Sequence, residues 1–201
     1  EVERRVRQLE SEREALYRIL LKDPLSLSGA VRQNLRSAPV LRNHRGEWSP
    51  PSNIIILGGT SARALEPVLN FPSSDLEKQK GADSLWRFRR AVTEADLLAV
   101  AGWTAEHPEH ARACEGVLDR HRTLLKPAVV RALLSLKFLQ TASGDVVAPA
   151  DAYLRNHVTE ACLGAGTLFP AGTRVDLYTL LGCRKDPSAQ DILAYLAHLR
   201  T

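Results

Sequence analysis

The sequence contains no methionine, only three cysteines, and no apolar run that approaches the roughly 20 residues needed to span a membrane. Because the chain opens at Glu1 without an initiator methionine, we expect it to be an excised part of a longer protein. The cysteines, Cys114, Cys162 and Cys183, are odd in number and irregularly spaced, which argues against a disulfide framework and fits a reducing compartment. No signal-peptide pattern is visible either. We therefore expect a cytoplasmic protein without a membrane partner.

The amino-acid composition lies within the range of globular proteins, with 44% hydrophobic and 25% charged residues. Wholesale disorder is therefore not expected, and 201 residues suffice for one large or two small domains with a buried core. The formal net charge of +4 is mildly basic. Such a balance permits contact with nucleic acid or an acidic protein surface and requires neither.

The most informative pattern is an internal repeat with a period slightly below one hundred residues. Val31-Arg32 is echoed by Val130-Arg131 after 99 residues and Pro51 by Pro149 after 98, which indicates the loss of one residue between them. Further pairs are Gly46 and Gly144, Phe71-Pro72 and Phe169-Pro170, and the segments 93–98 and 188–193. A duplicated unit is typical of a building block rather than of a catalyst.

Local signals predict mostly helices, with one short hairpin in each copy. Helices are expected at about 1–21, 26–38, 94–106, 108–125, 127–136 and 191–200, and a short one near 62–69. Apolar pairs on either side of Gly46 and of Gly144 predict the two hairpins, and 53–57 is a candidate third strand. Thr93 with Asp96, and Ser188 with Asp191, have the spacing of a helix capping box.

The predicted fold class is thus α+β and predominantly helical. We expect two tandem copies of a unit made of helices plus a small β-hairpin, the first at 1–107 and the second at 108–201.

Two groups of residues have spacings used in binding sites, but neither matches a full motif. Gly58-Gly59 follows an apolar run as in a phosphate-binding loop, yet the Lys-Ser/Thr ending is missing, which favours a plain turn. His107, His110, Cys114 and His121 are the only cluster with metal-ligand chemistry. No second close ligand pair accompanies them, and Cys114 is flanked by core-like residues. A metal-dependent or cysteine enzyme at 107–121 thus stays an alternative and not the main prediction. We predict no catalytic residue, no metal site and no cofactor.

Basic and aromatic residues are interleaved in two stretches. Arginine can contact phosphates while aromatic rings stack on bases, so these stretches offer a second alternative, a nucleic-acid-binding module. A solvated or salt-bridged basic surface is the simpler interpretation. The candidate interaction surface comprises Arg42, His44, Arg45, Trp48, Arg87, Arg89 and Arg90.

Three repeated strings resemble the repeat regions of sacsin and of bacterial sacsin-like proteins with an Hsp90-type ATPase domain. They are LRSAPVLRNHRGEW at 35–48, FLQTASGDVVAP at 138–149 and LLGCRKDPSAQDILAYL at 180–196. The resemblance implies repeats that surround a nucleotide-binding domain and serve chaperone-like or scaffolding roles. This chain has no Asp-x-Gly-x-Gly or Gly-x-x-Gly-x-Gly string, so no ATP site carries over to it. We expect a non-enzymatic protein-interaction, scaffolding or coupling segment, with a protein or neighbouring domains as its partner.

Overall fold

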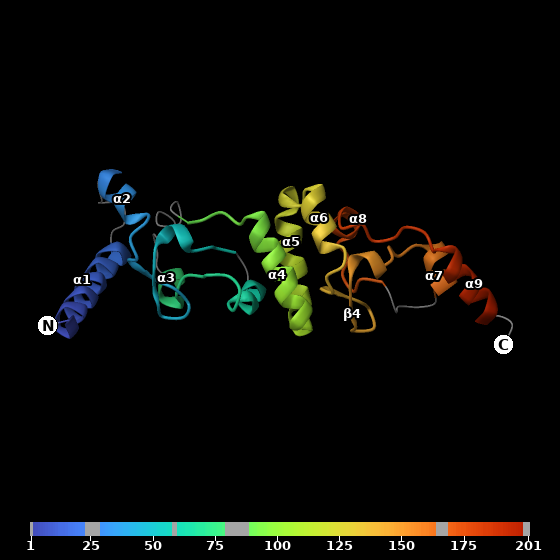
Figure 1. Cartoon of the computed structure of the whole chain (residues 1–201), viewed down its shortest axis with the longest axis horizontal. Coiled ribbons are helices and arrows are strands. Elements are labelled where there is room, and N and C mark those ends of the chain that lie inside the picture. The colour runs from blue at the N-terminus through green and yellow to red at the C-terminus, as the bar shows by residue number, and fades with distance from the viewer. Residues whose placement is uncertain (1, 23–28, 58–59, 79–88, 164–168, 199–201) are drawn as a thin grey trace. The chain divides into compact units, whose positions relative to one another are not determined.

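The computed structural model describes residues 2–22, 29–57, 60–78, 89–163 and 169–198 (Figure 1). Contacts divide the chain into two compact units. The first comprises Glu1–Gly58 and Leu69–Ala91, and the second comprises Gly59–Val68 and Val92–Thr201. Among the described residues, no helix is both long and apolar enough to cross a membrane.

The described part of the first unit contains three helices and one hairpin. Its elements are α1 (Val2–Lys22), α2 (Gly29–Leu35), β1 (Leu41–Arg42), β2 (Trp48–Ser49), the 3-10 turn η1 (Pro51–Asn53) and α3 (Ser74–Lys78). A small core of buried side chains joins them, comprising Tyr17, Val40, Leu41, Ile54 and Leu76. This core draws on the helices, the hairpin and the extended chain after η1, so each element is held by residues distant in sequence.

The second unit is larger and contains six α-helices in its described part. Its elements are η2 (Thr60–Leu65), α4 (Glu94–Glu106), η4 (Pro108–His110), α5 (Ala111–Arg120), η5 (Arg122–Leu124), α6 (Pro127–Leu133), β3 (Leu139–Gln140), β4 (Val146–Val147), η6 (Pro149–Asp151), α7 (His157–Leu163), α8 (Val175–Leu180) and α9 (Ala189–His198). Helix α5 lies at its centre, because α4, η2 and β3 all pack against it. The predicted class, predominantly helical with two small antiparallel sheets, is confirmed.

The two hairpins have the same register and the same turn. Leu41 pairs with Ser49 in the first, and Leu139 pairs with Val147 in the second. Gly46 and Gly144 both have a positive φ, 77° and 96°, which explains why glycine occupies the turn in both copies. Each hairpin is therefore closed by local backbone chemistry that the sequence alone specifies.

The connections around each hairpin also recur with a spacing of 98 residues. The amide of His44 donates to the carbonyl of Phe71 and that of Ala142 to Phe169, both at 2.9 Å. The amides of Ser52 and Ala150 donate to Arg36 and Leu134. The last pair aligns Leu134 with Arg36, which is again a spacing of 98 residues. The predicted change of spacing from 99 to 98 residues is therefore wrong. Adjacent valines at 129 and 130 allowed the shifted match, because either one aligns with Val31 by residue type.

Some predicted elements differ from the structure. Residues 53–57 form no strand. Ile54 and Ile55 are buried, but their backbone hydrogen bonds go to separate segments: the Ile54 amide donates to Pro51 and its carbonyl accepts from Arg90, and the Ile55 amide donates to Asn70. The predicted helix 108–125 is divided into η4, α5 and η5. Helices α3, α7 and α8 were not predicted, since each has seven residues or fewer and lacks a periodic apolar pattern long enough to recognise.

Helix α4 packs against α5 and α6, which lie beyond the predicted repeat boundary. Thr104 of α4 and Cys114 of α5 meet in this contact as hydrogen-bonded side chains. The boundary between compact units therefore precedes α4, at 91/92. The division into 1–107 and 108–201 concerns the sequence repeat and stays a prediction.

Two glycines allow opposite stability effects to be predicted. Gly144→Ala is expected to lower the free energy of unfolding by about 1 kcal/mol, because alanine disfavours its positive φ. Gly102→Ala, within α4, is expected to raise it by about 1 kcal/mol, since a Cβ there meets nothing within 4 Å and alanine favours the helix. Urea denaturation followed by circular dichroism measures both. Changes of the same sign in the free energy of unfolding would contradict the different backbone conformations of Gly144 and Gly102.

Candidate interaction surfaces

Arg42 and Trp48 of the predicted basic surface lie side by side on the first hairpin. The Arg42 guanidinium carbon lies 5.0 Å from the centre of the Trp48 ring, and one guanidinium nitrogen is 2.8 Å from a Glu14 carboxylate oxygen. The Trp48 ring also meets Tyr17 edge-on, with 5.8 Å between ring centres. Arg42 and Trp48 thus connect the hairpin to α1, a role that needs no ligand.

His44 also makes contacts within the first unit. Its Nδ1 accepts a hydrogen bond from the Phe71 amide at 3.1 Å, and its Nε2 lies 3.2 Å from Arg45 Nε. Arg89 is exposed, the Arg90 amide donates to the carbonyl of Ile54, and Arg87 lies outside the described residues. The structure thus brings together Arg42 with Trp48 and His44 with Arg45, and their role in binding a partner stays a prediction.

Two of the three histidines in 107–121 belong to an aromatic stack. The rings of His107 and His110 stack on Trp103, with centres 4.4 and 4.8 Å away. Cys114 is fully buried, and burial raises the pKa of its thiol to about 12, so little thiolate exists at neutral pH. Burial also lowers the pKa of His121. Within the described ranges, no group of three or more His, Cys, Asp or Glu side chains converges as metal ligands would.

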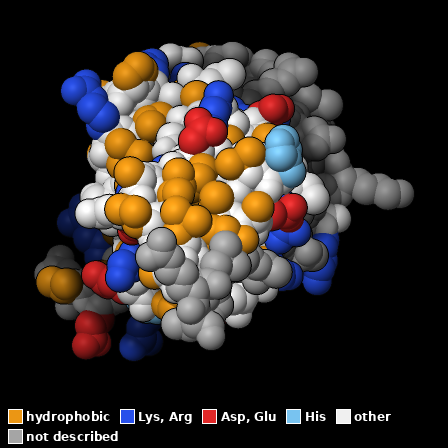
Figure 2. Space-filling model, turned by 90° about the vertical axis from the view of Figure 1, so that its right-hand side faces the viewer, with side chains coloured by type: hydrophobic (Ala, Val, Ile, Leu, Met, Phe, Trp, Pro, Cys, Tyr) orange, Lys and Arg blue, Asp and Glu red, His pale blue; other side chains and the backbone are white. Residues whose placement is uncertain are grey.

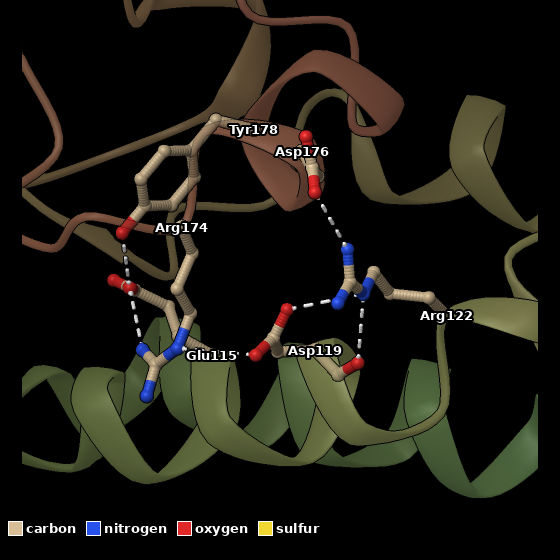
Figure 3. A network of polar contacts seen from close by, with 6 residues as sticks. All are labelled: Glu115, Asp119, Arg122, Arg174, Asp176 and Tyr178. Carbon is tan, nitrogen blue, oxygen red and sulfur yellow. Dashed lines mark hydrogen bonds and ion pairs between the residues drawn. The ribbon is translucent and has the colours of Figure 1, made fainter.

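A carboxylate that the sequence analysis missed lies at the centre of the second unit. Glu115 of α5 is buried and accepts hydrogen bonds from the Gln140 amide at 3.1 Å and the Tyr178 hydroxyl at 2.9 Å. Figure 3 shows the hydrogen bond to Tyr178. Arg174 approaches the same carboxylate at 3.4 Å. Burial raises the pKa of Glu115 above its ordinary value, and these partners oppose the shift. Burial and the neighbouring Glu115 charge raise the pKa of Tyr178.

The network continues outward to the surface through alternating charges. Arg174 also contacts Asp119 at 3.5 Å, and Arg122 bridges Asp119 and Asp176 at 3.2 and 3.3 Å (Figure 3). These outer pairs are solvent-exposed and contribute little stability individually. Together they link α5 and η5 to the start of α8. The arrangement is typical of a structural clamp.

A pocket of about 360 Å³ adjoins this clamp. It is lined by Ala142, Leu154, Arg155, Pro170, Ala171, Gly172, Thr173, Val175 and Tyr178. The hydroxyl of Tyr178, which belongs to both pocket and clamp, already donates to Glu115 and has a raised pKa. It is therefore a poor general base at neutral pH.

Two helical surfaces expose large apolar side chains. We call the first the α7–α9 face, and Figure 2 shows hydrophobic side chains gathered on this side of the second unit. It comprises Val158, Ile192, Leu193 and Leu196, which are 43%, 40%, 66% and 49% exposed. The second, the α1 face, comprises Val2, Val6, Leu9, Leu16 and Ile19, each at least 38% exposed. Such surfaces are typical of protein interaction sites.

Sequence periodicity could have identified the α1 face, because its residues recur at helical spacing. The α7–α9 face carried no such signal, since α7 is too short and packs against a helix distant in sequence. The Glu115 clamp carried none either, since Glu115 lies about sixty residues from Arg174 and Tyr178. In comparisons with family models, curated proteins and solved structures, no match to this chain was found.

Proposed function

We propose that the chain consists of two tandem copies of one helical unit and acts as a non-enzymatic protein-interaction module. In this proposal the copies belong to the sacsin-like repeats and scaffold or couple parts of a larger, chaperone-like ATPase protein. The single observation that carries the proposal is the exposure of the α7–α9 face in a chain whose second copy otherwise repeats the first.

The recurring backbone supports the two-copy architecture. Hairpin registers, turn glycines and the hydrogen bonds that tie each hairpin to its following loop all recur at a spacing of 98 residues. Helix α2 and helix α6 share this spacing as well. Such agreement over distant backbone contacts supports two similar folds more strongly than a likeness of short strings does.

The side chains that differ between the copies favour a structural role over an enzymatic one. Glu115 has all its partners inside the fold, and Cys114 has a raised pKa and lies in the α4–α5 contact. The Trp103 stack occupies His107 and His110. The exposed apolar side chains, in contrast, are in contact with solvent. Their burial against another protein surface would be favourable.

The proposal is tested with the dye bis-ANS, which binds accessible apolar surface. The variant Ile192→Glu/Leu196→Glu is expected to give lower dye emission than the wild-type chain, because both substitutions charge the α7–α9 face. Ala194→Glu, on the opposite side of α9, serves as the matched control and should leave emission unchanged. Equal emission from all three proteins would contradict an accessible protein-binding face.

Two further measurements on the same protein decide between this proposal and its alternatives. Fluorescence anisotropy with labelled single-stranded DNA and RNA at low salt is expected to show no binding. Binding that weakens steeply as salt rises would instead support the nucleic-acid alternative. Turnover of ATP by this chain alone would overturn the non-enzymatic assignment.

A further inference from the structure

In the first copy, a helix covers the apolar surface of the last two elements. Its elements η2 and α4 both pack against α5, the central helix of the second copy. The side chains of α4 that are buried are Leu97, Val100, Ala101 and Thr104, at the spacing of one helical face. Leu65 of η2 is buried as well. Helix α5 therefore packs against a surface formed by η2 and α4. We call such a surface a helix seat.

The described part of the second copy contains two elements that correspond to η2 and α4, and their apolar side chains are exposed. By the 98-residue spacing, η2 (Thr60–Leu65) corresponds to 158–163 in α7. Helix α9 corresponds to α4, because Ser188 and Asp191 make the same three cap hydrogen bonds as Thr93 and Asp96. Helices α7 and α9 pack together. The elements η2 and α4, which pack against α5, thus correspond to α7 and α9, which form the α7–α9 face.

The burial of matched residues shows the difference. The cap aligns Leu97 with Ile192 and Ala101 with Leu196. Leu97 and Ala101 are fully buried, whereas Ile192 and Leu196 are 40% and 49% exposed. The α7–α9 face therefore corresponds to the surface of η2 and α4 that packs against α5, but its apolar residues are exposed.

The chain itself carries a helix of the required kind. Helix α2 precedes the first hairpin as α6 precedes the second, so the same spacing aligns α1 with the segment that contains α5. Leu16 corresponds to Cys114 and Ile19 to Val117, both of which are buried in α5. Cys114 directly meets Thr104 of α4. In α1 the matching residues are exposed, so α1 presents an α5-like face without an α4-like partner.

We propose that the α7–α9 face of one chain binds the α1 face of a second copy, in the manner in which η2 and α4 hold α5. This inference rests on the proposed repeat architecture and names the partner of its exposed face. The two faces differ, so the contact is heterologous and head-to-tail, and it propagates rather than closing into a symmetric dimer. Because one helix in one seat buries a small area, the association is expected to be weak, with a dissociation constant on the order of micromolar or above.

Sedimentation velocity with two face variants tests the proposal. The wild-type chain is expected to show a weight-average sedimentation coefficient that rises with concentration. Ile192→Glu/Leu196→Glu removes the seat and Leu16→Glu/Ile19→Glu removes the helix face, so each variant alone should remain a monomer. Their equimolar mixture should form a one-to-one complex of twice the 22.2 kDa chain mass, because one variant keeps an intact seat and the other an intact helix.

Matched controls separate these effects from misfolding and from general charge. Ala194→Glu and Ser11→Glu each add one negative charge to the opposite side of α9 or α1, half the charge that each face variant adds, and both should associate as the wild type does. Circular dichroism of each variant should match the wild type, since all the substituted side chains are exposed or partly exposed.

The outcomes distinguish this inference from the proposed function. A mixture that stays monomeric, or face variants that associate like the wild type, would overturn the head-to-tail contact. If the wild-type chain is monomeric while bis-ANS emission still responds to the α9 substitutions, self-association is wrong and the proposed function stands. If neither measurement responds, both are wrong.

Discussion

Phe71→Ala and Phe169→Ala are each expected to lower the free energy of unfolding of their own unit by about 4 kcal/mol. Both rings are almost fully buried, and the two residues hold equivalent places, because each carbonyl accepts a hydrogen bond from the hairpin turn. Those backbone bonds survive the substitution. The loss therefore measures the removed ring and the cavity that it leaves.

Hydrogen exchange measured by mass spectrometry assigns each loss to a part of the chain. Phe71→Ala should accelerate exchange in the first unit and Phe169→Ala in the second. The exposed residues Val6 and Val175 provide controls, and their alanine variants should change stability by no more than about 0.5 kcal/mol. A uniform acceleration over both units from either phenylalanine variant would contradict their separate cores.

Glu115→Ala is expected to destabilise the second unit by about 3 kcal/mol. The substitution leaves the Gln140 amide and the buried Tyr178 hydroxyl without an acceptor, and each unsatisfied group costs about 1–3 kcal/mol. Relief of the buried charge offsets part of that loss. Urea denaturation measures the difference, and the exposed Glu109→Ala is the control with a change near zero.

The raised pKa of Glu115 adds a pH dependence with a definite sign. As pH rises above the ordinary value of 4.5, the unfolded chain releases this proton before the folded chain does. Unfolding is then favoured, so the contribution of Glu115 to stability is complete below this window and falls as pH rises through it. Glu115→Gln cannot ionise. The stability of the wild type relative to this variant should therefore fall with increasing pH, and a constant difference would contradict the raised pKa.

Much of the local structure could be predicted from the sequence because its causes are local. Gly46 and Gly144 specify the turns by their positive φ, and Thr93 with Asp96 specifies the start of α4 through its capping box. The one-residue error in aligning the helices before the hairpins had a local cause too. Residue types favoured a spacing of 99, because Arg32 matches Arg131 only there, and the backbone hydrogen bonds of the folded chain gave a spacing of 98.

The candidate surfaces divide along the same line. The exposed stripe on α1 follows from helical periodicity, whereas the Glu115 clamp depends on segments about sixty residues apart that meet only after folding. The basic residues are a third case. Arg42 and Trp48 are typical of a binding surface in the sequence, and the fold shows in addition that they connect the hairpin to α1. Their role in binding a partner stays a prediction.

The sequence by itself determined the turns, the caps and the predominantly helical class, because each depends on neighbouring residues or on a periodicity readable along the chain. Only the tertiary structure showed that η2 and α4 pack against α5, and that α7 and α9 pack together while large apolar side chains on them stay exposed. Burial depends on what lies across a contact, and sequence order does not specify that neighbour.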